Sequence, residues 1–248
     1  MTEAAESLDE LRNRLYQAYA SQHAGTGEND APALVYRRDI RPLLPLPATG
    51  PVVDLGCGRG ELVRLMQADG FMAEGVDISP EQVALARAAG ITGVRQEDFR
   101  AVLAAHPAYY VAITATDLLE HLTKSEVLRT FDDVVAALAP GGVFVARVPN
   151  AVSPLGGHIR AGDFTHLTSF TERSIRQLAV AVGFESVVAR PSAPIAHGLV
   201  SAVRVVVWQV VSACYRLSLA AETGVLRGHI VTQNLTFAVR KGTIAAEQ

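Results

Sequence analysis

Short apolar runs alternate with segments of helical periodicity along most of the 248-residue chain. The runs predict strands, because a few consecutive apolar residues bounded by turn residues suit a strand buried on both faces. We predict strands at residues 51–55, 72–78, 93–96, 109–114, 143–148, 184–189 and 234–240, and helices at 61–69, 80–90, 125–138 and 171–182. This alternation predicts an α/β fold with a mainly parallel sheet that carries helices on both faces.

Two segments fall outside this alternation. Residues 1–34 combine a polar, helix-prone stretch with a loop rich in Gly and Glu, and we interpret them as a helical arm or lid ahead of one domain at 35–248. Residues 149–170 are rich in glycine and lack periodicity, which predicts a long loop at the substrate side of the sheet.

A third such segment, residues 195–221, is rich in Val and Ala and precedes the last predicted strand. A membrane-spanning helix needs about 20 continuous apolar residues, and Arg204 and Arg216 enclose too few. Apolar residues recur at helical spacing at Leu199, Val203, Val206, Val210, Cys214 and Leu217. The pattern predicts an inserted amphipathic helix that packs on its own domain or on a second copy in a homodimer, with peripheral membrane contact left as the alternative.

Composition and charge exclude several classes of protein. Hydrophobic residues make up 49% of the chain and charged residues 19%, enough apolar surface for a core. A formal charge of −3 gives no basic footprint for nucleic acid. Two cysteines, Cys57 and Cys214, form no disulfide framework. The acidic first ten residues lack the apolar region of a signal peptide, so we expect a cytoplasmic protein.

The sequence Asp54-Leu55-Gly56-Cys57-Gly58-Arg59-Gly60-Glu61 carries the strongest motif. A predicted strand leads into three alternate glycines and then into a helix, and glycine allows both a sharp turn and a close approach of ligand to backbone. A dinucleotide-binding turn would need a small residue where Glu61 stands. The acidic side chains of Asp54 and Glu61 instead favour a ligand with a positively charged end.

Two further acidic positions follow the next predicted strands. Asp77 ends the second strand, where a carboxylate can accept both hydroxyls of a ribose. Asp98 and Phe99 follow the third strand, where they can accept from an adenine amino group and cover the ring. Acids at three successive strand ends beside a glycine turn favour a nucleoside ligand.

With Pro140-Gly141-Gly142, these motifs resemble the class I S-adenosylmethionine-dependent methyltransferases over residues 35–148. The resemblance implies a Rossmann-like sheet of seven strands whose last strand, 234–240, is antiparallel, and S-adenosylmethionine as cofactor. The residues that it implies at the cofactor are Asp54, Gly56, Gly58, Gly60, Asp77, Ile78, Asp98, Phe99, Thr116 and Asp117. Cys57 is then a loop residue and not a nucleophile.

Candidate acceptor residues follow the fourth and fifth strands. Glu120 and His121 come after the fourth, and Asp163 and His166 lie in the glycine-rich loop after the fifth. A histidine with an ordinary pKa near 6.5 is largely neutral at pH 7 and can accept a proton. We predict that His121 or His166 is the base, and that Glu120 and Asp163 orient it, or that all four hold a divalent ion such as Mg²⁺.

A second resemblance covers residues 147–184 and the apolar helix. This part is similar to bacterial sugar and polysaccharide O-methyltransferases, among them those of mycobacterial methylmannose polysaccharide synthesis. It implies a sugar or oligosaccharide acceptor, with the 1-hydroxyl of a short mannoside favoured. The alternatives are an O- or N-methyltransferase of another small metabolite and a non-catalytic protein that binds S-adenosylmethionine.

Overall fold

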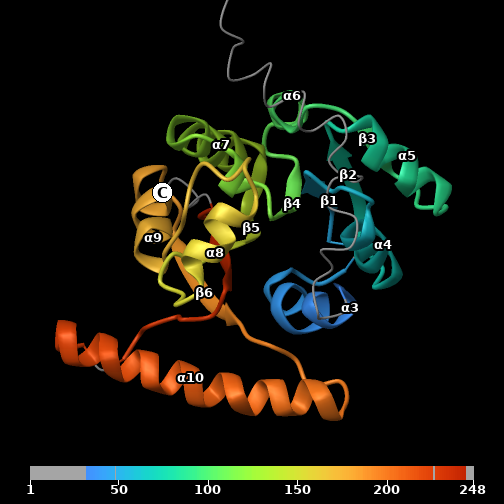
Figure 1. The fold of residues 1–248 in the computed structure, drawn as a ribbon. Helices are drawn as coiled ribbons and strands as arrows, with labels where there is room; N and C mark the ends of the chain where they lie inside the picture. The colour runs from blue at the N-terminus through green and yellow to red at the C-terminus, as the bar shows by residue number, and fades with distance from the viewer. Residues whose placement is uncertain (1–31, 48, 226, 244–248) are drawn as a thin grey trace, which may run out of the picture.

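The computed structural model describes residues 32–47, 49–225 and 227–243. In this part of the chain seven strands form one sheet, in the order β3-β2-β1-β4-β5-β7-β6 (Figure 1). The strands are β1 (Pro51–Leu55), β2 (Met72–Asp77), β3 (Val94–Gln96), β4 (Tyr110–Thr116), β5 (Leu138–Pro149), β6 (Ser186–Ser192) and β7 (Asn234–Arg240). The predicted α/β class and seven-stranded sheet are confirmed.

The direction of the strands places the site. Strands β1 to β5 run parallel to one another, whereas β7 pairs antiparallel with both β5 and β6. The antiparallel last strand is therefore confirmed as well. The strand order reverses between β1 and β4. In a sheet of this kind ligands bind beyond the carboxyl ends of the strands, beside such a reversal.

Helices surround the sheet, and local capping explains where several begin. Ser79 accepts a hydrogen bond from the backbone N–H of Gln82, and Thr123 forms a reciprocal capping box with Glu126. The described helices are α3 (Pro32–Val35), η1 (Tyr36–Ile40), η2 (Arg41–Leu43), α4 (Glu61–Ala68), α5 (Pro80–Ala88), α6 (Phe99–Ala105), η3 (Leu119–His121), α7 (Lys124–Ala137), α8 (Gly156–Gly162), α9 (Glu172–Ala181) and α10 (Leu199–Thr223).

The core consists of two apolar clusters, one on each face of the sheet. On one face Phe131 of α7 packs against Phe144 of β5 and Phe237 of β7, with ring centroids 5.8 and 6.2 Å away. On the other face Met66 of α4 and Tyr36 of η1 are buried. Burial on both faces keeps the central strands rigid, so the loops at their carboxyl ends start from fixed positions.

Several sequence predictions differ from the structure. β5 begins at Leu138 and not at residue 143, because Tyr110 pairs with Leu138 before the register shifts at Ala112. The predicted loop 149–170 contains α8, and α6 was not predicted. The predicted arm, residues 1–34, lies outside the described residues except for 32–34, so the proposed boundary stays a prediction.

Helix α10 differs most from its prediction. Its small residues Ser201, Ser212 and Ala220 are buried, whereas Val206 and Val210 of the apolar face are 60% and 61% exposed. The prediction that this face packs on its own domain is therefore wrong. The 25-residue helix is also long and apolar enough to cross a membrane by length and composition, so the two arginines do not exclude a span on that ground.

Candidate functional site

The turn between β1 and α4 follows the predicted glycine pattern. Gly56, Gly58 and Gly60 have φ angles of 64°, 53° and 73°, a left-handed backbone that side chains rarely adopt. A fourth glycine, Gly75 of β2, was not singled out in the sequence. A Cβ atom there would lie 2.7 Å from the Cβ of Cys57, so Gly75 lets the turn rest directly on β2.

A cavity of about 970 Å³ opens beside this turn, at the carboxyl ends of β1, β2, β3 and β4. Eight of the ten residues implied at the cofactor line it, namely Gly56, Gly58, Asp77, Ile78, Asp98, Phe99, Thr116 and Asp117. The topology thus brings together residues that lie up to 61 positions apart in the chain. Asp54 and Gly60 are not among the residues that line this cavity.

Gly60 lies behind the turn, in the core. It is buried, and a Cβ atom on it would come within 2.9 Å of Val94 Cγ2 and 3.1 Å of Ile91 Cγ2. Its role is therefore to let α4 start close to the neighbouring α5–β3 connection. This packing gives Gly60 a structural role, and a contact of its backbone with a cofactor stays a prediction.

Asp54 faces a smaller cavity of about 150 Å³, which shares Cys57, Arg59 and Thr116 with the main cavity. Asp54 Oδ1 accepts a hydrogen bond of 2.7 Å from Thr114 Oγ1, and Oδ2 has no hydrogen-bond partner among the described residues. Burial raises the pKa of Asp54 to about 7. The fully buried carboxyl thus stays protonated to near neutral pH.

The Asp54→Asn variant is expected to change how stability depends on pH. The folded protein keeps the proton of Asp54 up to about pH 7, whereas the unfolded chain loses it near the ordinary value of 3.8. Stability therefore falls as pH rises between these values and is level above them. In Asp54→Asn the free energy of unfolding is expected to lose this decrease with pH, which amounts to up to about 4 kcal/mol in the wild type. Urea unfolding across the pH range measures it. An unchanged slope in the variant would contradict the assignment.

Asp77 ties the glycine turn to the end of β2. Its Oδ2 accepts a hydrogen bond from the backbone N–H of Gly58, and Oδ1 accepts one from Ser79 N–H, both at 2.8 Å. Burial raises the pKa of Asp77, against the lowering effect of these two hydrogen bonds. The sequence predicted a ribose-binding carboxylate here, and the structure adds a role in fixing the turn.

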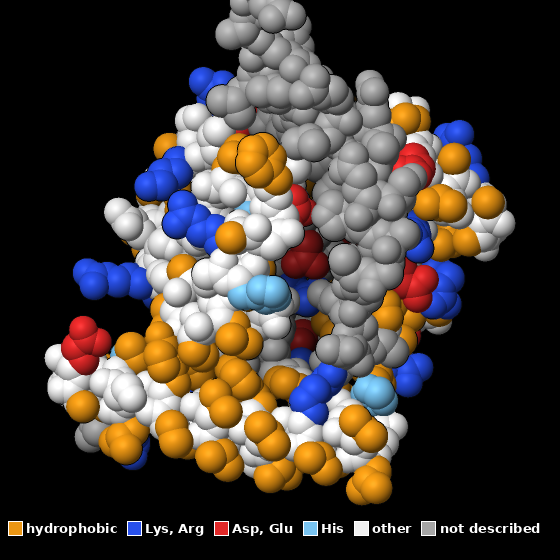
Figure 2. Space-filling view, viewed as in Figure 1, with side chains coloured by type: hydrophobic (Ala, Val, Ile, Leu, Met, Phe, Trp, Pro, Cys, Tyr) orange, Lys and Arg blue, Asp and Glu red, His pale blue; other side chains and the backbone are white. Residues whose placement is uncertain are grey.

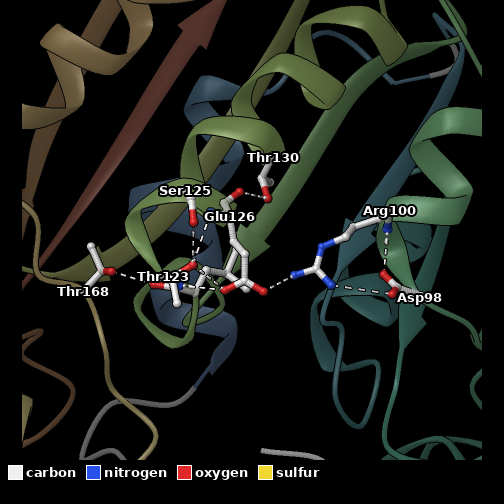
Figure 3. Close-up of polar contacts among 8 residues, drawn as sticks. Asp98, Arg100, Thr123, Ser125, Glu126, Thr130 and Thr168 are labelled. Carbon is white, nitrogen blue, oxygen red and sulfur yellow. Dashed lines mark hydrogen bonds and ion pairs between the residues drawn. The ribbon is translucent and has the colours of Figure 1, made fainter. Parts of the chain in front are cut away.

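The far end of the cavity is held by a polar network that the sequence did not reveal (Figure 3). Asp98 caps α6 by accepting from the N–H of Arg100, whose Nη2 donates to Glu126 Oε1 at 2.9 Å. Glu126 in turn accepts from the backbone and hydroxyl of Thr123. The network joins the starts of α6 and α7, and so fixes the position of Phe99 at the cavity wall.

The residue after β4 has an unusual backbone. Asp117 is not glycine, yet its φ angle is 54°. Its N–H donates to the carbonyl of Arg147 at 3.0 Å, and its carboxylate accepts from Arg147 Nη1 at 3.1 Å. These contacts hold a strained turn that presses Leu118 against Gly56, whose Cβ would lie 3.0 Å from Leu118 Cδ1.

The four predicted acceptor residues do come together. The rings of His121 and His166 have centroids 4.8 Å apart, and His166 Nε2 lies 4.0 Å from Asp163 Oδ2. Thr165, which the sequence analysis did not select, links the group. Its Oγ1 is 2.7 Å from His121 Nδ1 and 2.6 Å from Asp163 Oδ1.

The direction of these hydrogen bonds sets the tautomer of His121. The Thr165 hydroxyl gives its hydrogen to the Asp163 carboxylate, so it accepts from His121 Nδ1–H. In the neutral imidazole the lone pair then sits on Nε2. Among the four acceptor residues, His121 is the one that lines the main cavity, over the part of the chain that the structure describes.

Glu120 lies behind His121, with 1% of its surface exposed. Its Oε2 has no hydrogen-bond partner among the described residues. Burial, followed by the charges of Asp117 and Asp163, raises the pKa of Glu120 well above its usual value, although Arg147 opposes this. Burial thus disfavours the charged form of Glu120, which is not among the residues that line the main cavity.

Three of the same residues form a group of metal-ligand type. Ligand atoms of Glu120, His121 and His166 lie within 4.8 Å of one another, whereas Asp163 Oδ1 is used by Thr165. Magnesium prefers oxygen ligands, and two imidazoles with one carboxylate do not supply them. The residues present therefore do not fit the predicted Mg²⁺, and no catalytic step is assigned to a metal.

Comparison with known proteins places the chain in a family. A model of the methyltransferase domain family matches residues 30–189, which include β1 to β5 and every residue of the cavity wall. The chain belongs to this methyltransferase family. The predicted family is thereby confirmed, while the resemblance to sugar O-methyltransferases stays a prediction.

The individual relatives agree with this family. A ubiquinone biosynthesis O-methyltransferase from Xylella fastidiosa is 32% identical over 103 residues, which cover 39% of this chain and 41% of that protein. A solved SAM-dependent methyltransferase from Archaeoglobus fulgidus aligns with a TM-score of 0.68 at 20% identity, over 90% of this chain and 99% of that one. The match therefore spans about two fifths of the curated relative, and the structural likeness shows the fold.

A second similar structure shows how widely this fold is used. The phosphoethanolamine N-methyltransferase 2 of Haemonchus contortus, solved with S-adenosyl-L-methionine, aligns with a TM-score of 0.60 at 14% identity. The alignment covers 92% of this chain and 57% of the other. Since O- and N-methyltransferases share the fold, the fold does not determine the acceptor, and only the residues of the site bear on it.

Proposed function

We propose that this methyltransferase transfers a methyl group from S-adenosylmethionine to a hydroxyl group, with a sugar or oligosaccharide hydroxyl as the first acceptor class. The observation that carries the proposal is the chain of hydrogen bonds from Asp163 through Thr165 to His121, which ends at the wall of the cavity beside the glycine turn. Such a chain is what an acceptor with a weakly acidic proton requires.

The cavity suits S-adenosylmethionine at several points. A Cβ on Gly58 would meet only Gln82, with its nearest atom 3.8 Å away, so the absent side chain leaves room beside the turn. Asp77 and Ile78 lie at the end of β2, and Asp98 with Phe99 lies at the end of β3, in the order that ribose and adenine would need. Asp54 lines the smaller cavity beneath the turn, where its Oδ2 has no hydrogen-bond partner among the described residues and can accept from a donor.

The chemistry follows from the placement of His121. When bound, S-adenosylmethionine supplies a methyl group activated by a positively charged sulfur. His121 Nε2 would accept the proton of a hydroxyl placed at the cavity wall, so that the oxygen could receive the methyl group while the sulfur keeps the bonding electron pair. Asp163 stabilises the resulting imidazolium through Thr165, and His166 shields the pair from one side.

The resemblance of residues 147–184 to sugar O-methyltransferases supports a sugar acceptor. The chemistry of the acceptor supports it as well, because a sugar hydroxyl is a very weak acid and gains most from a positioned base. A second candidate is an acceptor from quinone biosynthesis, favoured by the ubiquinone biosynthesis O-methyltransferases among the relatives. Both candidates are O-methylations and use the same base.

One experiment separates the candidates. The purified chain is incubated with labelled S-adenosylmethionine and either a panel of mannosides and other sugars or a panel of ubiquinone precursors, and products are identified by mass and NMR. Methylated sugar supports the first proposal, and methylated precursor supports the second. Methylation of amines in place of hydroxyls, or tight binding without turnover on any acceptor, would contradict both.

The donor set at Glu120, His121 and His166 leads to a separate prediction about metal. We expect EDTA to leave the rate of methyl transfer within about twofold of the untreated enzyme, since the base is an imidazole and not a metal-bound oxygen. Added Mg²⁺ should likewise have little effect. A loss of activity with EDTA that Mg²⁺ restores would show this interpretation of the site to be wrong.

A further inference from the structure

The outer side of α10 is an uncovered apolar surface, which we call the α10 face. Within the described residues its large members are Leu199, Val200, Val203, Val206, Val207, Val210, Val211 and Leu217, each between 43% and 85% exposed. Figure 2 shows hydrophobic side chains along the outer edge of this helix, which lies apart from the sheet in Figure 1. We propose that the α10 face docks on the surface of a lipid bilayer that contains anionic lipids.

The width of the α10 face favours a flat partner. With about 100° of rotation per residue, its members cover an arc of roughly 140° on the helix. A second helix would cover only a narrow seam of such a surface, whereas a bilayer can cover it all. No charged residue lies within this arc from Leu199 to Ala221.

The charges at its borders also suit a lipid surface. With the same rotation per residue, Arg204 lies about 20° beyond one border of the α10 face, where a long side chain can reach lipid headgroups while its stem contacts the apolar layer. Arg216 lies nearer the domain side of the helix, and its Nε donates to the carbonyl of His229 at 3.3 Å. Between β6 and β7 the chain carries three Arg against one Glu, although the whole chain has a formal charge of −3. The segment is therefore cationic on an acidic protein, which is the complement of an anionic bilayer.

The connections of α10 decide between a surface position and a span. The helix leaves the sheet after Ser192 and returns at Asn234, and these two residues are paired with each other. If α10 crossed the bilayer, the connection to β7 would have to cross back, although its described residues lie in no helix or strand, and Arg227 would go with it. The helix therefore lies along the surface, with its buried Ser201 and Ser212 side toward the domain.

The attachment points also relate the surface to the site. Asn234 pairs with Pro149 at the carboxyl end of β5, so α10 is joined to the edge of the sheet that carries the cavity. Docking through the α10 face brings that edge to the membrane. The inference is independent of the acceptor, because it rests on this helix and its connections alone.

The test is cosedimentation of the full chain with vesicles of phosphatidylcholine, with and without phosphatidylglycerol. We expect binding to the anionic vesicles that weakens with salt. The double variant Val206→Asp/Val210→Asp should bind at least about tenfold more weakly, because two apolar contacts are replaced by charges. Val180→Asp on α9 is the matched control, a valine 73% exposed away from the α10 face, and should bind as the wild type does.

Other results would overturn the proposal. Circular dichroism and S-adenosylmethionine binding of the double variant show whether its fold is intact. Failure of the wild type to bind vesicles, or equal binding by a folded double variant, contradicts docking. A dimer in light scattering that the double variant abolishes, without vesicle binding, makes the α10 face a subunit interface instead. Resistance to alkaline carbonate extraction would show insertion and not surface docking.

Discussion

In the His121→Ala variant, kcat for methyl transfer to a hydroxyl acceptor is expected to be about 10²-fold to 10⁴-fold lower, which is the usual contribution of a general base. His121 lines the main cavity and its Nδ1–H is held by Thr165, so its Nε2 is the atom that we propose as the proton acceptor. Affinity for S-adenosylmethionine should change little, since the glycine turn and Asp77 are untouched. Steady-state kinetics with labelled S-adenosylmethionine, together with calorimetric binding, measure the two effects separately.

Thr165 provides a second readout for the same arrangement. Thr165→Val removes the group that accepts from His121 Nδ1–H, so kcat should fall at least about tenfold and the pH profile of kcat should shift, because the link to Asp163 is lost. Thr165→Ser keeps the hydroxyl and should restore both. His229→Gln, a histidine on the connection after α10, serves as the control. A fully active, folded His121→Ala variant would rule out this base.

The Asp77→Ala variant is expected to weaken S-adenosylmethionine binding by at least about a hundredfold, since hydrogen bonds to a charged group contribute about 1.5–3 kcal/mol each. The carboxylate fixes the turn through Gly58 and Ser79 and faces the cavity. Asp77→Asn retains one acceptor oxygen and should give an intermediate loss. Isothermal titration calorimetry measures both, and Asp132→Asn, an exposed aspartate on α7, is the matched control.

The outcome for Asp77 also tests the cofactor assignment as a whole. If the wild type bound S-adenosylmethionine and Asp77→Ala bound it equally well, the cavity beside the glycine turn would not be the cofactor site. Thermal unfolding of the variant separates loss of binding from loss of the fold, because two backbone N–H groups lose their acceptor in Asp77→Ala.

The strands and the glycine turn were predictable because their signals are local. An apolar run bounded by turn residues predicts a buried strand wherever it stands, and the left-handed φ angles of Gly56, Gly58 and Gly60 leave few other residues that fit. The acids at the ends of β2 and β3 could be placed for the same reason, since parallel strands bring their carboxyl ends to one edge. The short helices α6 and α8 were missed because a helix of so few residues shows little hydrophobic periodicity in the sequence.

The sequence alone thus determined the methyltransferase fold, the cavity at the strand ends and the group of candidate acceptor residues. The tertiary structure decided which members of each set face the cavity: Asp54 and Gly60 do not line it, and His121 lines it in front of Glu120. It also turned the apolar side of α10 outward. Which residues face the cavity depends on contacts between distant parts of the chain, such as that of His121 with Thr165, 44 residues apart. The orientation of α10 depends on its connections to β6 and β7. Neither leaves a periodic signal in the sequence.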